Sequence, residues 1–227
     1  MHIEPGAVDG AKIVLSYATG VASLGLAAGM AAKTLSQKGG ARALAGRGTA
    51  STALVFAFFE VLPHYPVGVS EVHLILGSAL FLIFGAGPAA IGLAAGLLIQ
   101  GVFCTPSDLP QYGMNVTTLI VPLWALSRLA PKILPANRAY VEAGYGQALA
   151  LSAIYQAGIV AWVAFWTVYG NGLSAKNLGA VAQFGSAYVA VLAAEPLIDL
   201  AVLAVAKAIQ GSMPDWIFDR RLRVAAP

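Results

Sequence analysis

The chain has 227 residues, of which 59% are hydrophobic and only 10% are charged, and its formal net charge is +3. A soluble domain usually carries about 25% charged residues, so this composition excludes a soluble globular protein and indicates an integral membrane protein. The single cysteine, Cys104, excludes an intramolecular disulfide framework and a metal site built from several cysteines.

The N-terminal segment does not have the features of a cleaved signal. Residues 1–11 include Glu4 and Asp9 but no lysine or arginine, whereas a secretory signal begins with a basic region. The uncharged run that follows, residues 13–32, exceeds the usual signal core of about 7–15 residues and matches a membrane span of about 20 residues. We therefore expect an uncleaved start with a free amine on Met1.

Seven apolar segments predict an all-α integral membrane protein, with about seven transmembrane helices in one bundle. The second and third are too short to span a bilayer alone, so we expect them to be buried, tilted or extended by polar residues that face a cavity. We expect one membrane domain, residues 1–210, with an N-terminal segment at 1–10 and a basic-aromatic tail at 211–227 that anchors at the interface. The segments are residues 13–32, 50–62, 73–84, 89–103, 116–130, 141–169 and 178–209.

The distribution of basic residues predicts the orientation in the membrane. If the N-terminus is outside and the C-terminus cytoplasmic, only Lys12 and Lys176 of the 13 lysines and arginines lie outside. Cytoplasmic loops are generally enriched in these residues. The outer side then receives the first residues and the loop at 64–73, and with them all three histidines of the chain, His2, His64 and His73.

The pentapeptide GLAAG occurs twice, at residues 25–29 and 92–96. Small residues four positions apart let two membrane helices approach closely. Two interpretations are open: packing inside the bundle, or a face that docks a partner membrane subunit.

No enzyme is expected, because HExxH, GxSxG and Walker GxxxxGK[ST] motifs are absent from the sequence. If ATP drives this protein, another chain must hydrolyse it. No nucleic-acid partner is expected either.

The second residue, His2, offers a specific metal chemistry. The amine of Met1, the backbone nitrogen of His2 and the Nδ1 atom of its ring can close two fused chelate rings in one plane. A fourth nitrogen from a distant histidine would complete a square, which favours Ni(II) or Cu(II). Binding would release protons and weaken at low pH. The alternative is a chance histidine at a mobile chain end.

Four stretches of the sequence resemble motifs of one known protein family. The opening MHIEPG resembles the MHI-x-x-G start of the substrate-binding membrane component of cobalt/nickel energy-coupling-factor (ECF) ABC transporters, the CbiM/NikM type. Residues 65–74, YPVGVSEVHL, resemble that family's FPVPGTSGHL loop, with His73 on its histidine. Residues 113–116 resemble its G-x-N-V motif, and Glu195 lies where a late-helix glutamate is expected. The similarity extends to about residue 208.

Four positions depart from the family pattern. Gly68 and Val72 replace a proline and a glycine in the loop, and Thr118 and Tyr188 stand where asparagine and histidine are common. These departures concern the choice of metal and the surroundings of the ligands more than the ligands themselves.

The resemblance implies that the N-terminus threads into the bundle and that Met1, His2 and His73 bind the metal. It implies uptake of Ni²⁺ or Co²⁺, as a transported substrate rather than a cofactor, across the plasma or inner membrane of a bacterium or archaeon. The implied partners are a transmembrane coupling subunit and cytoplasmic ATPase subunits. The sequence does not choose between nickel and cobalt.

Three residues are candidates for supporting the ligands. Glu71 lies two residues before His73 and is placed to accept its second N–H, or else is a solvated loop acid. Asn115 either braces the N-terminal segment or caps a helix. His64 is either an entry ligand or an interfacial side chain.

Glu195 and Asp199 lie four residues apart on one face of the last segment, inside the membrane. Intramembrane acids are costly and are usually functional or paired. They could hold a proton, contact a partner subunit, or form hydrogen bonds with other helices. The alternative functions are therefore a proton-linked transporter that uses these acids, a carrier for an organic vitamin, and, least favoured, a membrane enzyme.

Overall fold

A computed structural model describes residues 3, 6, 8–62, 64–135, 137–209, 211–214 and 216–223. In these ranges the chain is helical except for one short β-hairpin and connecting loops. The α-helices are α1 (Ile13–Leu35), α2 (Gly40–Glu60), α3 (Gly77–Phe84), α4 (Ala86–Phe103), α5 (Tyr112–Ile133), α6 (Tyr145–Asn171), α7 (Ala175–Ile209) and α8 (Arg220–Arg223). The 3-10 helices are η1 (Gly10–Lys12), η2 (Pro106–Gln111) and η3 (Tyr140–Glu142), and the strands are β1 (Tyr65–Val67) and β2 (Ser70–Val72).

The expectation of an all-α membrane protein agrees with this architecture, and each of the seven predicted segments overlaps one of the helices α1 to α7. By length and composition, four helical stretches are able to cross a membrane: residues 10–35, 86–103, 145–171 and 175–209. Helices α2 and α5, at 21 and 22 residues, rise about 1.5 Å per residue and so reach the roughly 30 Å of a bilayer core by length alone.

Helix α3 differs from the other six because it is too short to be a span. Its eight residues extend about 12 Å at 1.5 Å per residue, and all of them are buried. Leu76, with φ 54°, precedes it in the left-handed region, and Gly85, with φ 84°, separates it from α4. The third predicted segment is therefore a buried helix between its neighbours, which was one of the possibilities expected for the short segments.

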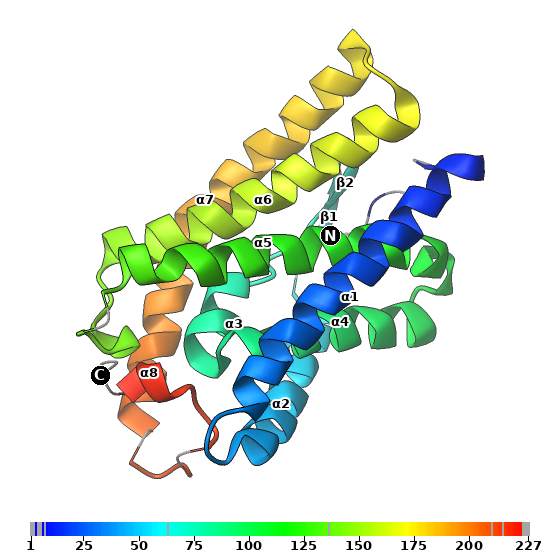
Figure 1. The fold of residues 1–227 in the computed structure, drawn as a ribbon. Coiled ribbons are helices and arrows are strands. Elements are labelled where there is room, and N and C mark those ends of the chain that lie inside the picture. The colour runs from blue at the N-terminus through cyan, green and yellow to red at the C-terminus, as the bar shows by residue number, and fades with distance from the viewer. Residues whose placement is uncertain are drawn as a thin grey trace.

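The helices pack in pairs around α3 (Figure 1). Helix α2 runs along α4, α1 along α5, and α6 contacts both α5 and α7. Helices α6 and α7 form a long antiparallel pair, joined by a short connection at residues 172–174. Helix α3 contacts α4, α5, α6 and α7, so it lies at the centre of the bundle.

The two copies of GLAAG have opposite environments. An added Cβ at Gly92 would lie 2.0 Å from Ser51 Oγ, and one at Gly96 would lie 2.7 Å from Val55 Cγ1, so this copy packs tightly against α2. At Gly25 and Gly29 an added Cβ meets nothing within 4 Å. The second copy is therefore used for packing inside the bundle, and the first lies on an open face of α1.

The C-terminal tail folds back onto the bundle. The backbone N–H of Asp219 donates to Ile83 O at the end of α3 (2.6 Å), and Arg47 Nε donates to Trp216 O (2.7 Å). Arg47 Nη1 also lies 3.5 Å from Asp219 Oδ2. Phe218 and Leu222 are buried, at 8% and 0% exposure. The expectation that the tail is an interfacial anchor is therefore wrong for these two side chains, which pack inside the protein instead of against lipid.

Arg221 connects this tail to the segment between α5 and α6. Its guanidinium donates to the backbone oxygens of Leu134 and Pro135 at 3.3 and 3.0 Å and lies over the ring of Tyr140, 4.6 Å from the centroid. Burial raises the pKa of the Tyr140 phenol, while Arg221 opposes that rise. The tail therefore closes one end of the bundle.

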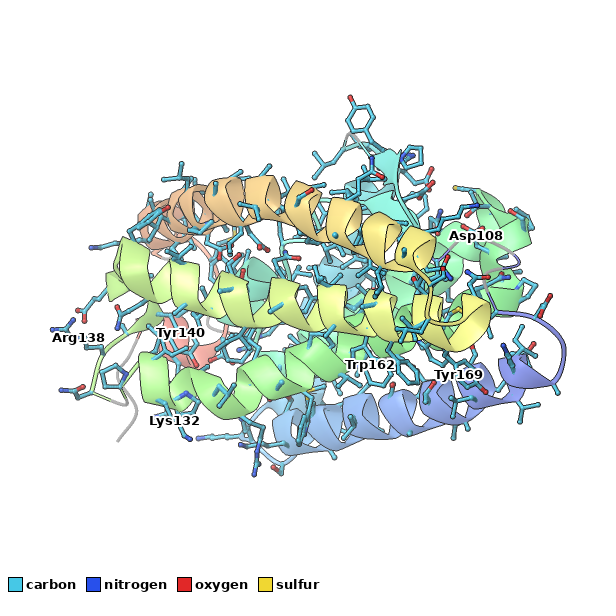
Figure 2. The ribbon with its side chains drawn as sticks, turned by 90° about the horizontal axis from the view of Figure 1, so that it is seen from above. Asp108, Lys132, Arg138, Tyr140, Trp162 and Tyr169 are labelled. Atoms are coloured by element: carbon cyan, nitrogen blue, oxygen red, sulfur yellow. The ribbon has the colours of Figure 1, made fainter. Side chains whose placement is uncertain are left out.

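The charged residues lie unevenly at the two ends. Lys132 and Arg138 lie at the same end as Tyr140, whereas Asp108 lies at the opposite end (Figure 2). This distribution agrees with the charge asymmetry noted in the sequence. The orientation of the termini across a membrane stays a prediction.

Candidate metal-binding site

The loop expected to carry the outer histidines contains a β-hairpin. Strands β1 and β2 pair antiparallel, with Tyr65 opposite Val72 and Val67 opposite Ser70. The two-residue turn between them starts with Gly68 at φ 66°. Hairpin turns often need a positive φ at this position, and glycine adopts it at no steric cost. An added Cβ there would lie 2.3 Å from Ala180 O, so the turn also packs on α7. The sequence analysis missed this hairpin, although VGVS with a central glycine was its signal.

The N-terminal segment is fastened to this hairpin inside the bundle. Ile3 forms an antiparallel bridge with Ser70 of β2. Its backbone N–H donates to Asn115 Oδ1 on α5 at 3.0 Å. Ile3, Ser70 and Asn115 are each 1% exposed. The side chain of Asn115 therefore bonds the N-terminal segment directly, across 112 positions of sequence.

His73 follows β2 and is buried, at 2% exposure. Its Nε2 atom lies 3.0 Å from Glu71 Oε2. The ring of Phe59 meets it edge-on at a centroid distance of 5.2 Å, and the ring of His64 stacks on it at 4.9 Å and 11°. His64 itself is exposed. The structure thus brings Glu71, His64 and His73 together, with His73 innermost.

Two of the three expected ligands, Met1 and His2, lie outside the described residues. Across the ranges that the structure describes, no three histidine, cysteine, aspartate or glutamate side chains are grouped so that they could hold a metal ion.

The two acids of α7 form a separate polar cluster. Glu195 and Asp199 are both 0% exposed. Ser78 of α3 donates to Asp199 Oδ2 at 2.7 Å and lies 3.3 Å from Glu195 Oε1. On α6, Ser152 and Gln156 donate to Glu195 Oε2, the second at 2.6 Å. None of these hydrogen bonds involves His73.

The sequence analysis did not identify the polar partners on α3 and α6. Ser152 and Gln156 lie four residues apart within an otherwise apolar segment, the same spacing as Glu195 and Asp199. That matched spacing was an available signal, because residues four apart share one face of a helix.

Two of the departures from the family pattern are also buried. Thr118 is fully buried and its hydroxyl donates to Met114 O within α5 at 2.7 Å. Tyr188 is 3% exposed and packs against Phe184, with ring centroids 4.8 Å apart.

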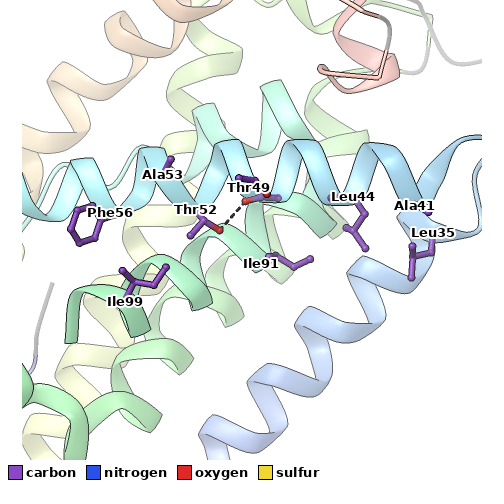
Figure 3. A pocket seen from close by; sticks show the side chains of 11 residues that line it. Leu35, Ala41, Leu44, Thr49, Thr52, Ala53, Phe56, Ile91 and Ile99 are labelled. Atoms are coloured by element: carbon purple, nitrogen blue, oxygen red, sulfur yellow. Dashed lines mark hydrogen bonds between the residues drawn. The ribbon is translucent and has the colours of Figure 1, made fainter. Parts of the chain in front are cut away.

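An apolar groove lies away from the histidines. It runs along α2, with Leu35 of α1 at one end and Ile91 and Ile99 of α4 on its other side (Figure 3). Its lining is almost entirely apolar, apart from Thr49 and Thr52, and Thr52 bonds its own helix at Gly48 O. His73, the candidate ligand among the described residues, does not line it.

Comparison with known proteins gives one match. Searches of curated proteins and of solved structures found nothing similar to this chain. The sequence profile of CbiM, described as the cobalt uptake substrate-specific transmembrane region, matches residues 2–213. That range includes His2, the hairpin with His73, Asn115 and both acids of α7, and it confirms the resemblance noted in the sequence. The chain therefore belongs to the CbiM family of cobalt uptake transmembrane components.

Proposed function

We propose that this chain is the metal-capturing subunit of an ECF-type uptake system for Co²⁺ or Ni²⁺. The ion would be held by the Met1 amine, the backbone and ring nitrogens of His2, and the His73 imidazole. The ion is the transported cargo, and the chain carries out no chemical step on it.

The contacts of Ile3 are the observation that carries this proposal. Its bridge to Ser70 and its hydrogen bond to Asn115 hold a buried residue beside the strand that leads to His73. His2 is the covalent neighbour of Ile3, and consecutive Cα atoms are about 3.8 Å apart. The geometry therefore favours an N-terminal chelate in the interior, near the distant histidine that a square of nitrogens requires.

The contact between His73 and Glu71 supports a ligand role for the imidazole. A metal-binding histidine commonly gives its other N–H to a carboxylate, which fixes the ring orientation and increases the basicity of the ligand atom. Because Glu71 engages Nε2, the metal would be bound through Nδ1. The stacked ring of His64 lies on the exposed side of His73, so His64 is an entry residue in this proposal rather than a ligand.

The partners follow from the proposed transport system. A transmembrane coupling subunit and cytoplasmic ATPase subunits would reorient the loaded chain, so that an ion captured on the outer side is released inward. The expected location is the plasma or inner membrane of a bacterium or archaeon.

Metal analysis of purified protein with a native start and a C-terminal tag tests the ligand set. One equivalent of Co²⁺ or Ni²⁺ is expected in the wild type. Its loss is expected in His2→Ala, in His73→Ala, and in a chain with one residue added before Met1. His64→Ala is the matched control, because His64 stacks on His73 but is exposed, and it should retain the metal.

The same variants separate the alternatives. A carrier for an organic vitamin would bind no stoichiometric metal, and its solute binding would be indifferent to the added residue. Full metal occupancy in the extended chain or in His2→Ala would refute the proposed ligands.

A further inference from the structure

The buried carboxyl groups of Glu195 and Asp199 share a single hydroxyl. Ser78 Oγ lies 2.7 Å from Asp199 Oδ2 and 3.3 Å from Glu195 Oε1. A serine hydroxyl has one hydrogen, so it can donate to only one carboxylate at a time. The shorter distance identifies Asp199 Oδ2 as the acceptor, so Ser78 contributes little to stabilising a charge on Glu195.

The remaining donors are unequally divided between the two acids. Glu195 Oε2 accepts hydrogen bonds from Ser152 and from Gln156 Nε2. Asp199 accepts the one bond from Ser78, and its Oδ1 atom is buried with no hydrogen-bond partner in the described part of the chain. Hydrogen bonds donated to a carboxylate stabilise its charged form. Glu195 is therefore the better site for a negative charge.

The charges around the pair do not permit two ionised acids. Glu195 and Asp199 are 0% exposed and interact electrostatically with each other. In the described part of the chain, the phenols of Tyr155 and Tyr188 also interact with Glu195, and they bring no positive charge. Among the described residues neither acid forms a salt bridge with a lysine or arginine. Two neighbouring carboxylates in such a site disfavour double ionisation, and sharing a proton relieves the repulsion.

Further buried polar atoms around the pair are unsatisfied. Tyr155 is 0% exposed, its ring lies against Gly77 next to Ser78, and it interacts with Glu195. In the ranges that are described, its hydroxyl and Gln156 Oε1 have no hydrogen-bond partner. Buried polar atoms are usually paired, and two of the unpaired atoms, Gln156 Oε1 and Asp199 Oδ1, are acceptors, so the cluster has room for one more hydrogen.

We propose that Glu195 and Asp199 form a proton-binding site that holds one proton on Asp199 Oδ1, with Ser78 donating to Asp199 Oδ2. Glu195 carries the single negative charge, stabilised by Ser152 and Gln156. The site lies between α3, α6 and α7 and is separate from the proposed metal ligands. Its ligand is a proton rather than a metal ion, because among the described residues no third histidine, cysteine, aspartate or glutamate joins the two acids.

Infrared spectroscopy of the purified full-length chain tests this site directly. At neutral pH the wild type should show the C=O stretching band of one protonated, solvent-shielded carboxyl group. Asp199→Asn should abolish that band, whereas Glu142→Gln, which changes an exposed acid of η3, should leave it intact. Size-exclusion chromatography and circular dichroism check that the variants are folded.

Ser78→Ala provides a second test that does not remove either acid. The band should persist but move to higher frequency, because the Asp199 carbonyl loses its hydrogen bond. Absence of the band in the wild type would mean that both acids are ionised or that a cation replaces the proton, and would overturn the proposal. A band that survives in folded Asp199→Asn, or that does not move in Ser78→Ala, would overturn it equally.

Discussion

The two copies of GLAAG permit a matched test of packing in this bundle. We consider Gly92→Ala and Gly25→Ala, which make the same change in the same local sequence, each within a helix. At Gly92 the added methyl group would lie 2.0 Å from Ser51 Oγ and 2.7 Å from the Ser51 carbonyl carbon. Rotation of the serine side chain relieves the first contact but not the second, since the second is with backbone. At Gly25 the methyl group meets nothing within 4 Å.

The expected magnitudes follow from two opposing effects. Alanine in a helix interior is more favourable than glycine by roughly 0.5–1 kcal/mol, and this gain applies to both variants. Overpacking an already tight contact costs about 1–3 kcal/mol, and this cost applies only at Gly92. The difference between the two variants therefore isolates the packing cost of about 1–3 kcal/mol.

Thermal unfolding in detergent, followed by tryptophan fluorescence, measures this difference. A change of 1 kcal/mol shifts Tm by about 2–4 °C in a chain of this length. We expect Gly25→Ala to unfold at or slightly above the wild-type temperature and Gly92→Ala to unfold below it. Equal destabilisation of both variants, or no destabilisation of Gly92→Ala, would show that Gly92 is not required for the close packing of α4 against α2.

Three further predictions concern the tail, the metal and its supporting carboxylate. Arg221→Ala should lower the free energy of unfolding by about 1–3 kcal/mol, because hydrogen bonds from a charged donor and a cation–π contact are lost. Arg220 is an exposed neighbour, and Arg220→Ala should change the free energy of unfolding by less than about 0.5 kcal/mol in the same denaturation assay. Metal at about 100 times its Kd should stabilise the protein with its native start by about 2.7 kcal/mol. This stabilisation should raise Tm, and a chelator should reverse the rise. A similar rise in the N-terminally extended chain would contradict the ligand set. Glu71→Gln should weaken metal affinity about 10–100-fold while leaving one ion bound per chain, as titration calorimetry would measure; unchanged affinity would exclude a role for Glu71.

Much of the helical fold was predictable, because apolar runs and charged breaks mark membrane helices directly. The break between α3 and α4 was marked by glycines and Pro88, and the structure places Gly85 there at a positive φ. The buried position of α3 was only one of several expected possibilities, since apolar residues suit both a protein interior and lipid. The docking of the tail was not predictable, because Phe218 and its basic neighbours have the composition of an interfacial anchor.

The candidate site was predictable where single residues carry distinctive chemistry. His73 and Glu71 stood out as an imidazole and a carboxylate two positions apart, and the structure places them in contact. Ile3 did not stand out, because its contribution is a backbone N–H and a bridge, which any residue offers. The roles of Ser78 and Gln156 were not predicted for a related reason. An isolated polar residue in an apolar segment gives no functional signal in the sequence, because its role depends on which acid another helix places beside it.

Both ends of the chain are fastened to its middle, and this has a consequence for biogenesis. Ile3 bonds to Asn115, and the Asp219 backbone bonds to Ile83 while Arg47 bonds to Trp216, 169 positions later. During translation the helices can insert one after another, but Arg47 of α2 and the end of α3 must wait for residues 216–219 to leave the ribosome. A nascent chain that stalls before that point would have inserted its helices without this closure, and the open end of its bundle would distinguish it from the finished protein to a membrane protease.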